Sequence, residues 1–381
     1  MIIPGYSSTG SKRPEAMFDV ADEYVPRMVR SRGARVWDST GREYLDLTMA
    51  LGAVALGYGH PRVVEAVTQA MRDGAVGGLA PQLEVDVAER LARVLPGVEA
   101  VRFLKTGAEA VAAAVRIARV ATGRDHVLVC GYHGWLDWCG DAAGVPESTR
   151  ALRTPIPFND IDTLRRALVD ANPAAVIVEP VVDGPPDLAW LLALRDATSR
   201  SGCVLVFDEI KTALRVAVGG VAEATGVVPD LMVVGKALGN GMPIAAVGGG
   251  RAIMDAAART WISSTLATEW ASLAAARAVL EVFAVEPVVE HLAAQGRRLF
   301  EGLDGLAAAE PSRMVVRGIP QMCYLSFADP ADGGAVARWA ATQGLLFKRA
   351  AYNFVSYAHA ESDVTRSLAI IAQALEATRP C

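Results

Sequence analysis

The chain reads PDLMVVGKALGNG at residues 229–241, and this stretch decides how the rest of the sequence is interpreted. Its apolar run, residues 231–234, predicts a short buried strand. Lys236 follows that run after one glycine, and a glycine-rich turn comes next. A lysine held at a strand end and partly removed from water has a lowered pKa, so its amine can act as a nucleophile and form a Schiff base. The alternative is that Lys236 extends into solvent beside a turn. The two interpretations are distinguished by whether other residues suited to the same cofactor occur elsewhere in the chain.

Short apolar segments alternate with helical patterns along the middle of the chain. The sequence predicts strands over residues 101–104, 127–130, 175–178, 204–207 and 231–234, and helices over 109–120, 160–171 and 189–201. This alternation is typical of an α/β fold with a mostly parallel central sheet and helices on both faces. Such sheets bind ligands at the carboxyl ends of their strands, so residues directly after strands are the first candidates for a site.

The two ends of the chain have a different pattern. Residues 35–47 contain two alternating segments around a turn, which predicts a β-hairpin. Residues 315–377 mix strand-like segments with helices, which predicts a smaller α+β domain. We therefore expect an N-terminal segment and hairpin (1–50) that packs with the small domain, a large domain (51–286) and a small C-terminal domain (287–381).

The composition argues against several classes of protein. The 381 residues are 52% hydrophobic and 21% charged, as in globular proteins. The net charge is -5 and no basic block occurs, which argues against a nucleic-acid partner. No apolar run reaches the roughly 18 residues of a membrane span. The five cysteines are odd in number and form no Cys-x-x-Cys pair, which predicts a reduced, cytoplasmic protein without a metal site.

A possible anion site follows the strand expected at residues 101–104. Thr106, Gly107 and Ala108 stand where the next helix should begin. Free backbone N–H groups at a helix start, with a glycine that permits close approach, suit a phosphate group. An ordinary strand-to-helix turn with Thr106 as the N-cap explains the same residues equally well.

Three further residues follow expected strands. Tyr132 comes after residues 127–130 and could stack on a planar cofactor, although a partly buried aromatic corner is the simpler explanation. Asp208 comes after residues 204–207, where a carboxylate needs a partner, either a protonated pyridine nitrogen or a structural salt bridge. Glu179 is a second acid at a strand end and a weaker signal.

An anion cradle, an aromatic ring, an acid and a lysine are together the requirements of pyridoxal 5′-phosphate. The phosphate is anchored, the ring is stacked, the ring nitrogen is paired with a carboxylate and the aldehyde is held by a lysine. All four features are much less expected to occur together by chance than any one of them alone. Their combination favours Lys236 as a Schiff-base lysine over a lysine that extends into solvent.

The chain resembles the class III aminotransferases, which are fold-type I pyridoxal-phosphate enzymes. Within them it is most similar in motif to glutamate-1-semialdehyde 2,1-aminomutase and related transaminases. The motifs that carry the resemblance occur in family order and are WDSTG (37–41), GYGHP (57–61), FLKTGAEA (103–110), YHG (132–134), FND (158–160), EP (179–180), FDE (207–209), VPD (228–230), GKALGNGMP (235–243) and VSYAH (355–359).

The resemblance implies a role for each matching residue. It implies that Lys236 is the Schiff-base lysine and proton shuttle, that Asp208 pairs with the pyridinium nitrogen and that Tyr132 stacks on the ring. It also implies that Gly107 and Ala108 bind the phosphate. Glu179 and Glu209 become supporting acids.

A homodimer follows from one more match. In the family, a threonine downstream of the lysine reaches the phosphate of the neighbouring subunit, and Thr265 is the matching candidate here. The resemblance therefore implies active sites at the interface of a homodimer.

Three departures from the family pattern bear on function. The phosphate loop reads Thr-Gly-Ala where Ser-Gly-Thr is usual. Lys211 stands where many members have a glutamine near the cofactor; it could contact the cofactor or face solvent, and we expect solvent. The segment 135–148 is much shorter than the gating loop of the aminomutase. Because that loop retains the diamine intermediate, its loss favours a transaminase.

We therefore expect an aminotransferase that moves an amino group between a donor and a carbonyl acceptor by a ping-pong mechanism. An aminomutase, and a catalytically inert fold kept for binding, are the alternatives. A nicotinamide dehydrogenase is disfavoured because no GxGxxG opens a helix after the first strand. Weak candidates for substrate contacts, each also explicable as structural, are Trp135, Lys211, Arg349, Arg32, Glu269 and Tyr352.

Overall fold

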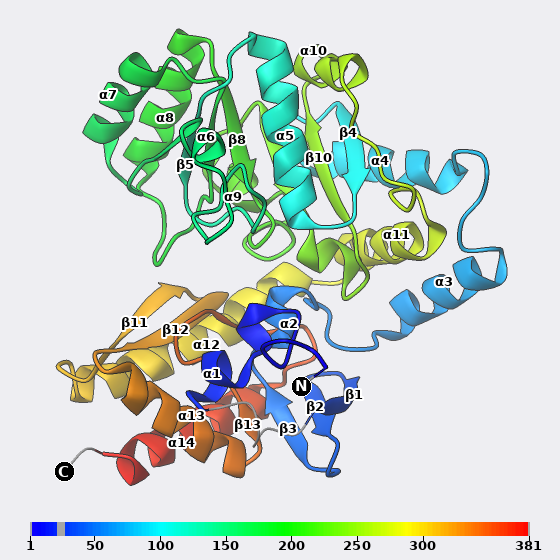
Figure 1. Cartoon of the computed structure of the whole chain (residues 1–381). Helices are drawn as coiled ribbons and strands as arrows, with labels where there is room; N and C mark the ends of the chain where they lie inside the picture. Colours follow the sequence, from blue (N-terminus) through cyan, green and yellow to red (C-terminus); the bar gives the residue numbers. More distant parts are fainter. Residues whose placement is uncertain (1, 21–26, 380–381) are drawn as a thin grey trace. The chain divides into compact units, whose positions relative to one another are not determined.

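The computed structural model describes residues 2–20 and 27–379 (Figure 1). The chain divides into two compact units. The small unit comprises residues 1–60 and 290–381, and the large unit comprises residues 61–289. The boundaries expected from the sequence were residues 50 and 286, so residues 51–60 lie with the small unit.

The large unit is built on a seven-stranded sheet with the order β4-β10-β9-β8-β7-β5-β6. Its strands are β4 (Ala100–Leu104), β5 (Val127–Cys130), β6 (Arg153–Pro155), β7 (Ala175–Val178), β8 (Val204–Asp208), β9 (Leu231–Val234) and β10 (Ala245–Gly249). The run from β6 to β9 is parallel, whereas β10 is antiparallel to both β9 and β4. The fold is thus the expected mostly parallel α/β architecture, with β6 and β10 added to the strands that the sequence predicted.

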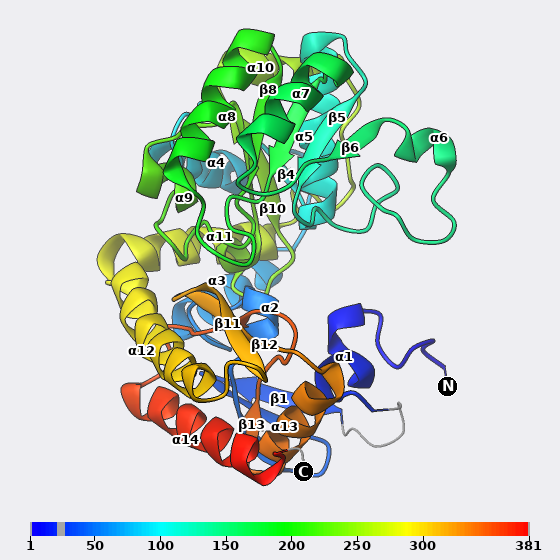
Figure 2. The same cartoon turned by 90° about the vertical axis from the view of Figure 1, so that its left-hand side faces the viewer.

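Helices cover both faces of this sheet, as Figures 1 and 2 show. One face packs on α5 (Gly107–Thr122), through alternate strand residues such as Val127, Ile177, Val206 and Val233. The residues between them, including Leu128, Val176, Leu205 and Met232, are also buried. The other helices of the unit are α3 (Pro61–Arg72), α4 (Gln82–Val94), α6 (Glu147–Arg150), α7 (Ile161–Ala171), α8 (Leu188–Ser201), α9 (Gly220–Thr225), α10 (Arg251–Met254) and α11 (Trp270–Val285), with 3-10 turns η3 (Lys236–Gly239) and η4 (Asp255–Arg259).

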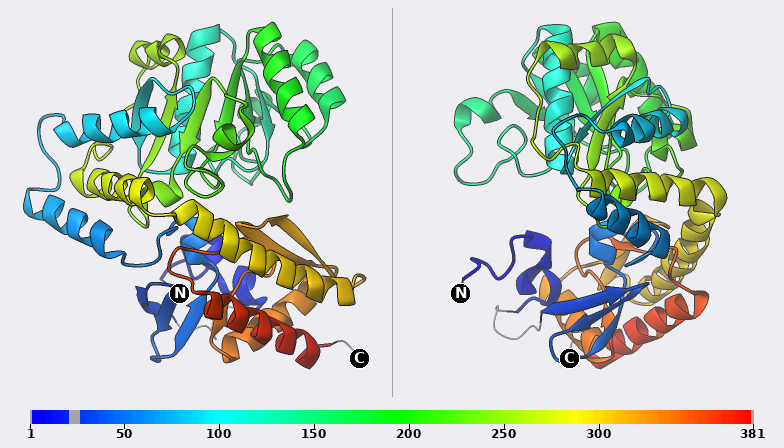
Figure 3. Two further views of the ribbon diagram at one scale, coloured as in Figure 1. Left: turned by 180° about the vertical axis from the view of Figure 1, so that it is seen from behind. Right: turned by 90° about the vertical axis from the view of Figure 1, so that its right-hand side faces the viewer.

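The small unit contains two sheets. The first has the order β1-β2-β3-β13, with β1 (Met28–Arg32), β2 (Arg35–Asp38), β3 (Glu43–Asp46) and β13 (Leu345–Leu346). The second has the order β11-β12-β14, with β11 (Met314–Ile319), β12 (Met322–Phe327) and β14 (Asn353–Phe354). The helices are η1 (Gly10–Lys12), α1 (Pro14–Phe18), α2 (Met49–Gly52), α12 (Val288–Ala309), α13 (Pro330–Thr342) and α14 (Glu361–Ala377), of which α13 and α14, orange and red in Figure 3, pack together.

The expected hairpin is formed by β2 and β3, and Asp38 holds its turn. One carboxylate oxygen of Asp38 accepts the backbone N–H of Thr40 at 2.8 Å, and the other accepts the hydroxyl of Tyr44 at 2.7 Å. These bonds hold the pKa of Asp38 at about 2, although burial acts to raise it. Because β13 pairs in parallel with β3, the hairpin is tied to the C-terminal part of the chain.

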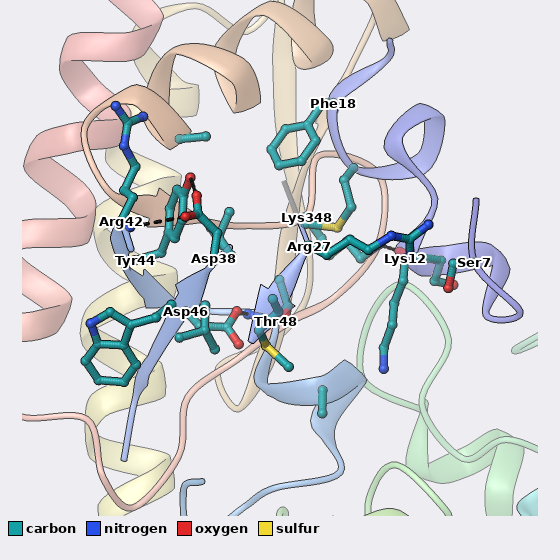
Figure 4. A pocket seen from close by; sticks show the side chains of 18 of the residues that line it. Ser7, Lys12, Phe18, Arg27, Asp38, Arg42, Tyr44, Asp46, Thr48 and Lys348 are labelled. Atoms are coloured by element: carbon teal, nitrogen blue, oxygen red, sulfur yellow. Dashed lines mark hydrogen bonds between the residues drawn. The ribbon is translucent and has the colours of Figure 1, made fainter. Parts of the chain in front are cut away.

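A cavity of about 730 Å³ lies in the small unit, between the hairpin, η1, α1 and α13 (Figure 4). Asp46 lines it and accepts a hydrogen bond from the Tyr58 hydroxyl at 2.7 Å. Lys348, which is buried, lines it too and donates to the carbonyl of Ser11. Residues 49–52 have positive φ, so the label α2 covers a left-handed turn. The residues expected to hold the cofactor all belong to the large unit, so this cavity is a separate feature.

Within the described residues, no helix is long and apolar enough to cross a membrane.

Candidate active site

Lys236 lies at the carboxyl end of β9 and opens η3. The extended Gly235 precedes it, and Lys236 itself has φ of +43°, a left-handed conformation that costs a non-glycine residue roughly 1–2 kcal/mol. Burial lowers the pKa of the Lys236 ammonium to about 8, and the positive charges of Lys211 and Arg215 lower it further against the opposing effect of Glu179 and Asp208. A lowered pKa raises the neutral fraction of the amine near pH 7, which favours a nucleophilic lysine.

Asp208 ends β8 and is 4% exposed. Its Oδ2 lies 2.9 Å from Nδ1 of His133, which is equally buried, and its Oδ1 accepts the N–H of Ile210 at 3.3 Å. A carboxylate can only accept, so Nδ1 of His133 carries the proton. No ion pair with lysine or arginine engages Asp208 in the described part of the chain. Asp208 therefore has His133 and the N–H of Ile210 as hydrogen-bond partners, and no lysine or arginine among the described residues.

Glu179 follows β7 and has a different partner. Its Oε1 lies 2.7 Å from Nζ of Lys211, and its Oε2 accepts the N–H of Tyr132 at 2.9 Å. The Lys211 side chain is only 16% exposed. The expectation that Lys211 faces solvent is therefore wrong. A carboxylate as buried as Glu179 is costly without a compensating charge, and Lys211 supplies that charge.

Tyr132 lies in the loop that follows β5. The loop turns at Gly131 and Gly134, which have φ of +102° and +104°. The Tyr132 side chain is 70% exposed, and that of Trp135 is 77% exposed. Tyr132 is thus not the partly buried aromatic corner that was the alternative, and its ring can receive a planar group.

The start of α5 has the geometry of a helix cap and of an anion cradle at once. The Thr106 hydroxyl accepts the N–H of Glu109 at 3.2 Å, and the Glu109 carboxylate accepts the N–H of Thr106 at 2.8 Å. The N-cap explanation of Thr106 is therefore correct. The N–H groups of Gly107 and Ala108 belong to the first helical turn, which provides no backbone acceptor for them.

Two close approaches join this helix start to the other strand ends. A Cβ on Gly107 would lie 2.5 Å from Cδ1 of Ile210, and a Cβ on Gly134 would lie 2.6 Å from Cβ of Ala108. The loops after β5 and β8 thus pack directly against the first turn of α5. The three loops form one continuous surface on the large unit.

Glu209 and Arg215 are buried beside this surface. Val221 and Ala222 donate their N–H groups to Glu209 at 3.0 and 2.8 Å, and the Thr212 hydroxyl also contacts its carboxylate. Burial raises the pKa of Glu209 to about 7 and lowers that of Arg215 to about 10. Glu209 thereby joins the end of β8 to α9.

Sequence reasoning assigned no role to two buried residues of this region. His133 stands inside a motif that the sequence singled out, and an aromatic donor beside a strand-end acid is a signal that could have identified it. Arg215 gave no such signal, because nothing in the sequence indicates that its side chain is 1% exposed.

The remaining candidates are placed elsewhere or have structural partners. Thr265 is exposed in a turn of the large unit. Glu269 caps α11 and pairs with Lys105 at 2.6 Å. Arg349 belongs to the small unit, where it pairs with Asp19 at 3.0 Å and donates to two backbone carbonyls. Tyr352 packs edge-on against Tyr324. Arg32 ends β1 and is exposed.

The sequence model described as aminotransferase class III matches residues 19–375. The chain belongs to this family. It is 33% identical to the glutamate-1-semialdehyde 2,1-aminomutase of Gemmatimonas aurantiaca, over 91% of this chain and 88% of the relative. It is also 33% identical to the enzyme of the same name from Thermomicrobium roseum, over 96% of this chain and 94% of the relative.

Solved structures agree with this membership. The FumI protein of Sphingopyxis sp. MTA144, solved with PLP, has a TM-score of 0.91 and 26% identity over 99% of this chain and 93% of its own. An omega-transaminase from Sphaerobacter thermophilus has a TM-score of 0.90 and 25% identity, covering 100% of this chain and 95% of its own. A beta-phenylalanine aminotransferase from Variovorax paradoxus has a TM-score of 0.85 and 27% identity, covering 98% of this chain and 91% of its own.

This class III aminotransferase is therefore a fold-type I enzyme that depends on pyridoxal phosphate. The surface around Lys236 fits that cofactor on its own chemistry. It provides a buried carboxylate with no lysine or arginine partner among the described residues, a lysine of lowered pKa and two helix-start N–H groups.

Proposed function

We propose that this class III aminotransferase moves an amino group from one amine substrate to a separate carbonyl substrate, with Lys236 as the lysine that holds the cofactor. The observation that carries the proposal is the arrangement of charges at the strand ends. Burial lowers the pKa of Lys236 to about 8, Asp208 is a buried carboxylate oriented by His133, and Glu179 is paired with Lys211.

The amine of Lys236 carries the protons in this proposal. When bound, pyridoxal phosphate supplies an aromatic ring that accepts the electron pair left on the substrate carbon. With the cofactor bound, Lys236 Nζ would take the proton from the substrate carbon as a base and hold it for return as an acid. A pKa of about 8 suits both roles near neutral pH.

Asp208 holds the ring nitrogen in its protonated form. Its orientation is supported by His133, which donates from Nδ1, and by the N–H of Ile210. Among the described residues no lysine or arginine pairs with Asp208, which suits this carboxylate to a cationic ring nitrogen. Glu179, whose charge is balanced by Lys211, is a less suitable partner.

Backbone and aromatic groups bind the rest of the cofactor. The N–H groups of Gly107 and Ala108 contact the phosphate, supported by the positive end of the 16-residue helix α5. Tyr132 stacks on the ring, in keeping with its 70% exposure. Thr265, also exposed, reaches the phosphate held by the partner subunit of a homodimer.

The competing function is an aminomutase, which shifts an amino group within one molecule. The curated relatives described above have that name. We favour a transaminase because the segment 135–148 after the Tyr132 loop is short, and a short segment is poorly suited to retain an intermediate. Arg349 is bound to Asp19 in the small unit and Lys211 is paired with Glu179, so Trp135, which is exposed, stays the candidate for substrate contacts in the large unit.

The enzyme is proposed to act in the cytoplasm. Cys130, Cys139, Cys203 and Cys323 are all unpaired thiols, three of them buried. Such cysteines are usual in a reducing compartment.

One experiment separates the candidate functions. The yellow holoenzyme is mixed with single amines, without any carbonyl acceptor, and both its visible absorbance and the products are recorded. A transaminase loses the absorbance in proportion to enzyme and releases a carbonyl product, and a keto acid restores the colour. An aminomutase forms many equivalents of an isomer without an acceptor. A protein that responds to no amine, or that keeps the colour as Lys236→Ala, contradicts both.

A further inference from the structure

Lys211 connects three strand ends of the large unit. It follows β8, it forms an ion pair at 2.7 Å with Glu179 after β7, and Glu179 in turn accepts the N–H of Tyr132 after β5 at 2.9 Å. The two side chains are 16% and 7% exposed. This is a largely buried ion pair, and its carboxylate uses both oxygens on groups of the same surface.

Glu179 also packs tightly against the Tyr132 loop. A Cβ on Gly131, whose φ is +102°, would lie 2.7 Å from Oε2 of Glu179. The loop is held again one residue later, where His133 donates to Asp208. Two carboxylates from neighbouring strands therefore hold successive residues of this loop, and Lys211 holds one of the carboxylates.

The charge of Lys211 matters as much as its position. Glu179 and Asp208 both act on the ammonium of Lys236, whose pKa they raise, whereas Lys211 lowers it. Without Lys211, Glu179 would be a buried carboxylate with no cation, and a second negative charge would act on the same amine. Lys211 thus balances Glu179, whereas Asp208 is bound by His133, and Arg215 is a second positive charge that lowers the pKa of Lys236.

We propose that Lys211 is a positioning residue of this active site: by pairing with Glu179 it fixes the loop that carries Tyr132, and it keeps Asp208 as the one carboxylate that acts on the cofactor ring. The proposal rests on the proposed role of Lys236. It gives a function to a residue that stands at the family's usual glutamine position and that acts through its ion pair with Glu179.

The test is a pH titration of the visible absorbance of the holoenzyme, which reports the protonation of the nitrogen of Lys236 once the cofactor is attached. Lys211→Met removes a positive charge and leaves Glu179 unbalanced. We expect the midpoint to rise by about one pH unit. Glu179→Gln removes the negative charge and should lower the midpoint. The double variant Lys211→Met/Glu179→Gln removes both charges and should return close to the parent value, and Lys211→Arg should leave it unchanged.

Lys105→Met is the matched control. Lys105 forms an ion pair with Glu269 at 2.6 Å with side chains 13% and 16% exposed, so the pair resembles Lys211–Glu179 in length and burial. Lys105 is not among the main causes of the lowered pKa of Lys236. Its replacement should change thermal stability about as much as Lys211→Met does, without moving the titration midpoint.

Visible circular dichroism of the bound cofactor gives a second reading, because it depends on how the surrounding groups orient the ring. We expect Lys211→Met to reduce this signal and Lys211→Arg to retain it. An unchanged midpoint in folded Lys211→Met, or a shift as large in Lys105→Met, overturns the proposal. Should Lys211→Met not fold, an unchanged midpoint in Glu179→Gln overturns it. A parent protein without visible absorbance, or an absorbance that survives Lys236→Ala, would instead overturn the proposed function.

Discussion

Nδ1 of His133 lies 2.9 Å from Oδ2 of Asp208, and the two side chains are 1% and 4% exposed. The histidine comes from the loop after β5 and the aspartate from the end of β8, so the bond spans the intervening strand β7. It fixes the rotation of the carboxylate. We propose that Asp208 is thereby prepared for a positively charged ring nitrogen before any ligand arrives.

The proposed role of Asp208 predicts what happens when only the negative charge of its carboxylate is removed. Asp208→Asn keeps the size of the side chain but cannot hold a pyridinium nitrogen protonated. We expect kcat to fall by roughly 100- to 1000-fold with the cofactor saturating. His133→Gln, which retains a donor, should cost about tenfold or less. A loss below threefold for Asp208→Asn would exclude Asp208 as the ring partner, and steady-state kinetics on the best amine make the measurement.

The contact between the Tyr132 loop and α5 predicts a specific intolerance at Gly134. A methyl group there meets Cβ of Ala108 at 2.6 Å, on a residue with φ of +104°. Gly134→Ala should weaken cofactor binding by about tenfold or more, because the loop must move away from the N–H groups of the cradle. Gly144→Ala is the control: φ is +94°, but no atom lies within 4 Å. Equal cofactor dissociation constants in the two variants would contradict the proposed cradle.

Glu209 should make the stability of the apoprotein depend on pH. Burial raises its pKa from 4.5 to about 7. The folded state therefore binds more protons than the unfolded state between these values, so this residue makes stability fall as the pH rises from about 4.5 to 7. Glu209→Gln should remove that contribution, of about 3 kcal/mol at most. Urea unfolding at pH 5 and pH 7 measures it; a stability difference between parent and variant that is the same at both pH values would contradict it.

The lowered pKa of Lys236 predicts how the apoprotein captures its cofactor. Only the neutral amine attacks an aldehyde, and the neutral fraction rises about tenfold per pH unit below the pKa. The second-order rate of cofactor attachment should therefore rise with pH, with a midpoint near 8, and stay level above it. Stopped-flow absorbance measures this rate. A midpoint near the ordinary lysine value of 10.5 would show that Lys236 is not activated by its surroundings.

The sequence predicted the parts of the site that depend on local pattern. Lys236 and Asp208 follow apolar runs that are strands, and parallel pairing of those strands brings both to one edge of the sheet. Thr106 shows why a local pattern leaves two explanations: the same turn is a helix cap and presents free N–H groups. The sequence did not predict the antiparallel strand β10, because its run of small residues, AAVGG, has a low β-propensity.

The pairing of Lys211 with Glu179 could not be predicted from the sequence. The two residues are far apart along the chain, and their contact depends on the neighbouring positions of β7 and β8 in the sheet. A lysine beside a turn most often extends into water, and that general preference produced the wrong expectation. Glu179 is buried beside Lys211 in the fold, and its charge draws the Lys211 side chain inward and away from solvent.

The central claim is that Lys236, and neither Lys211 nor another lysine, holds the cofactor. Borohydride reduction of the holoenzyme, followed by protease digestion and mass spectrometry, locates the cofactor directly. We predict that the reduced cofactor is attached to the peptide that contains Lys236, and that Lys236→Ala leaves no stoichiometric label. A label on Lys211, or a stoichiometric label that persists in Lys236→Ala, would contradict the account.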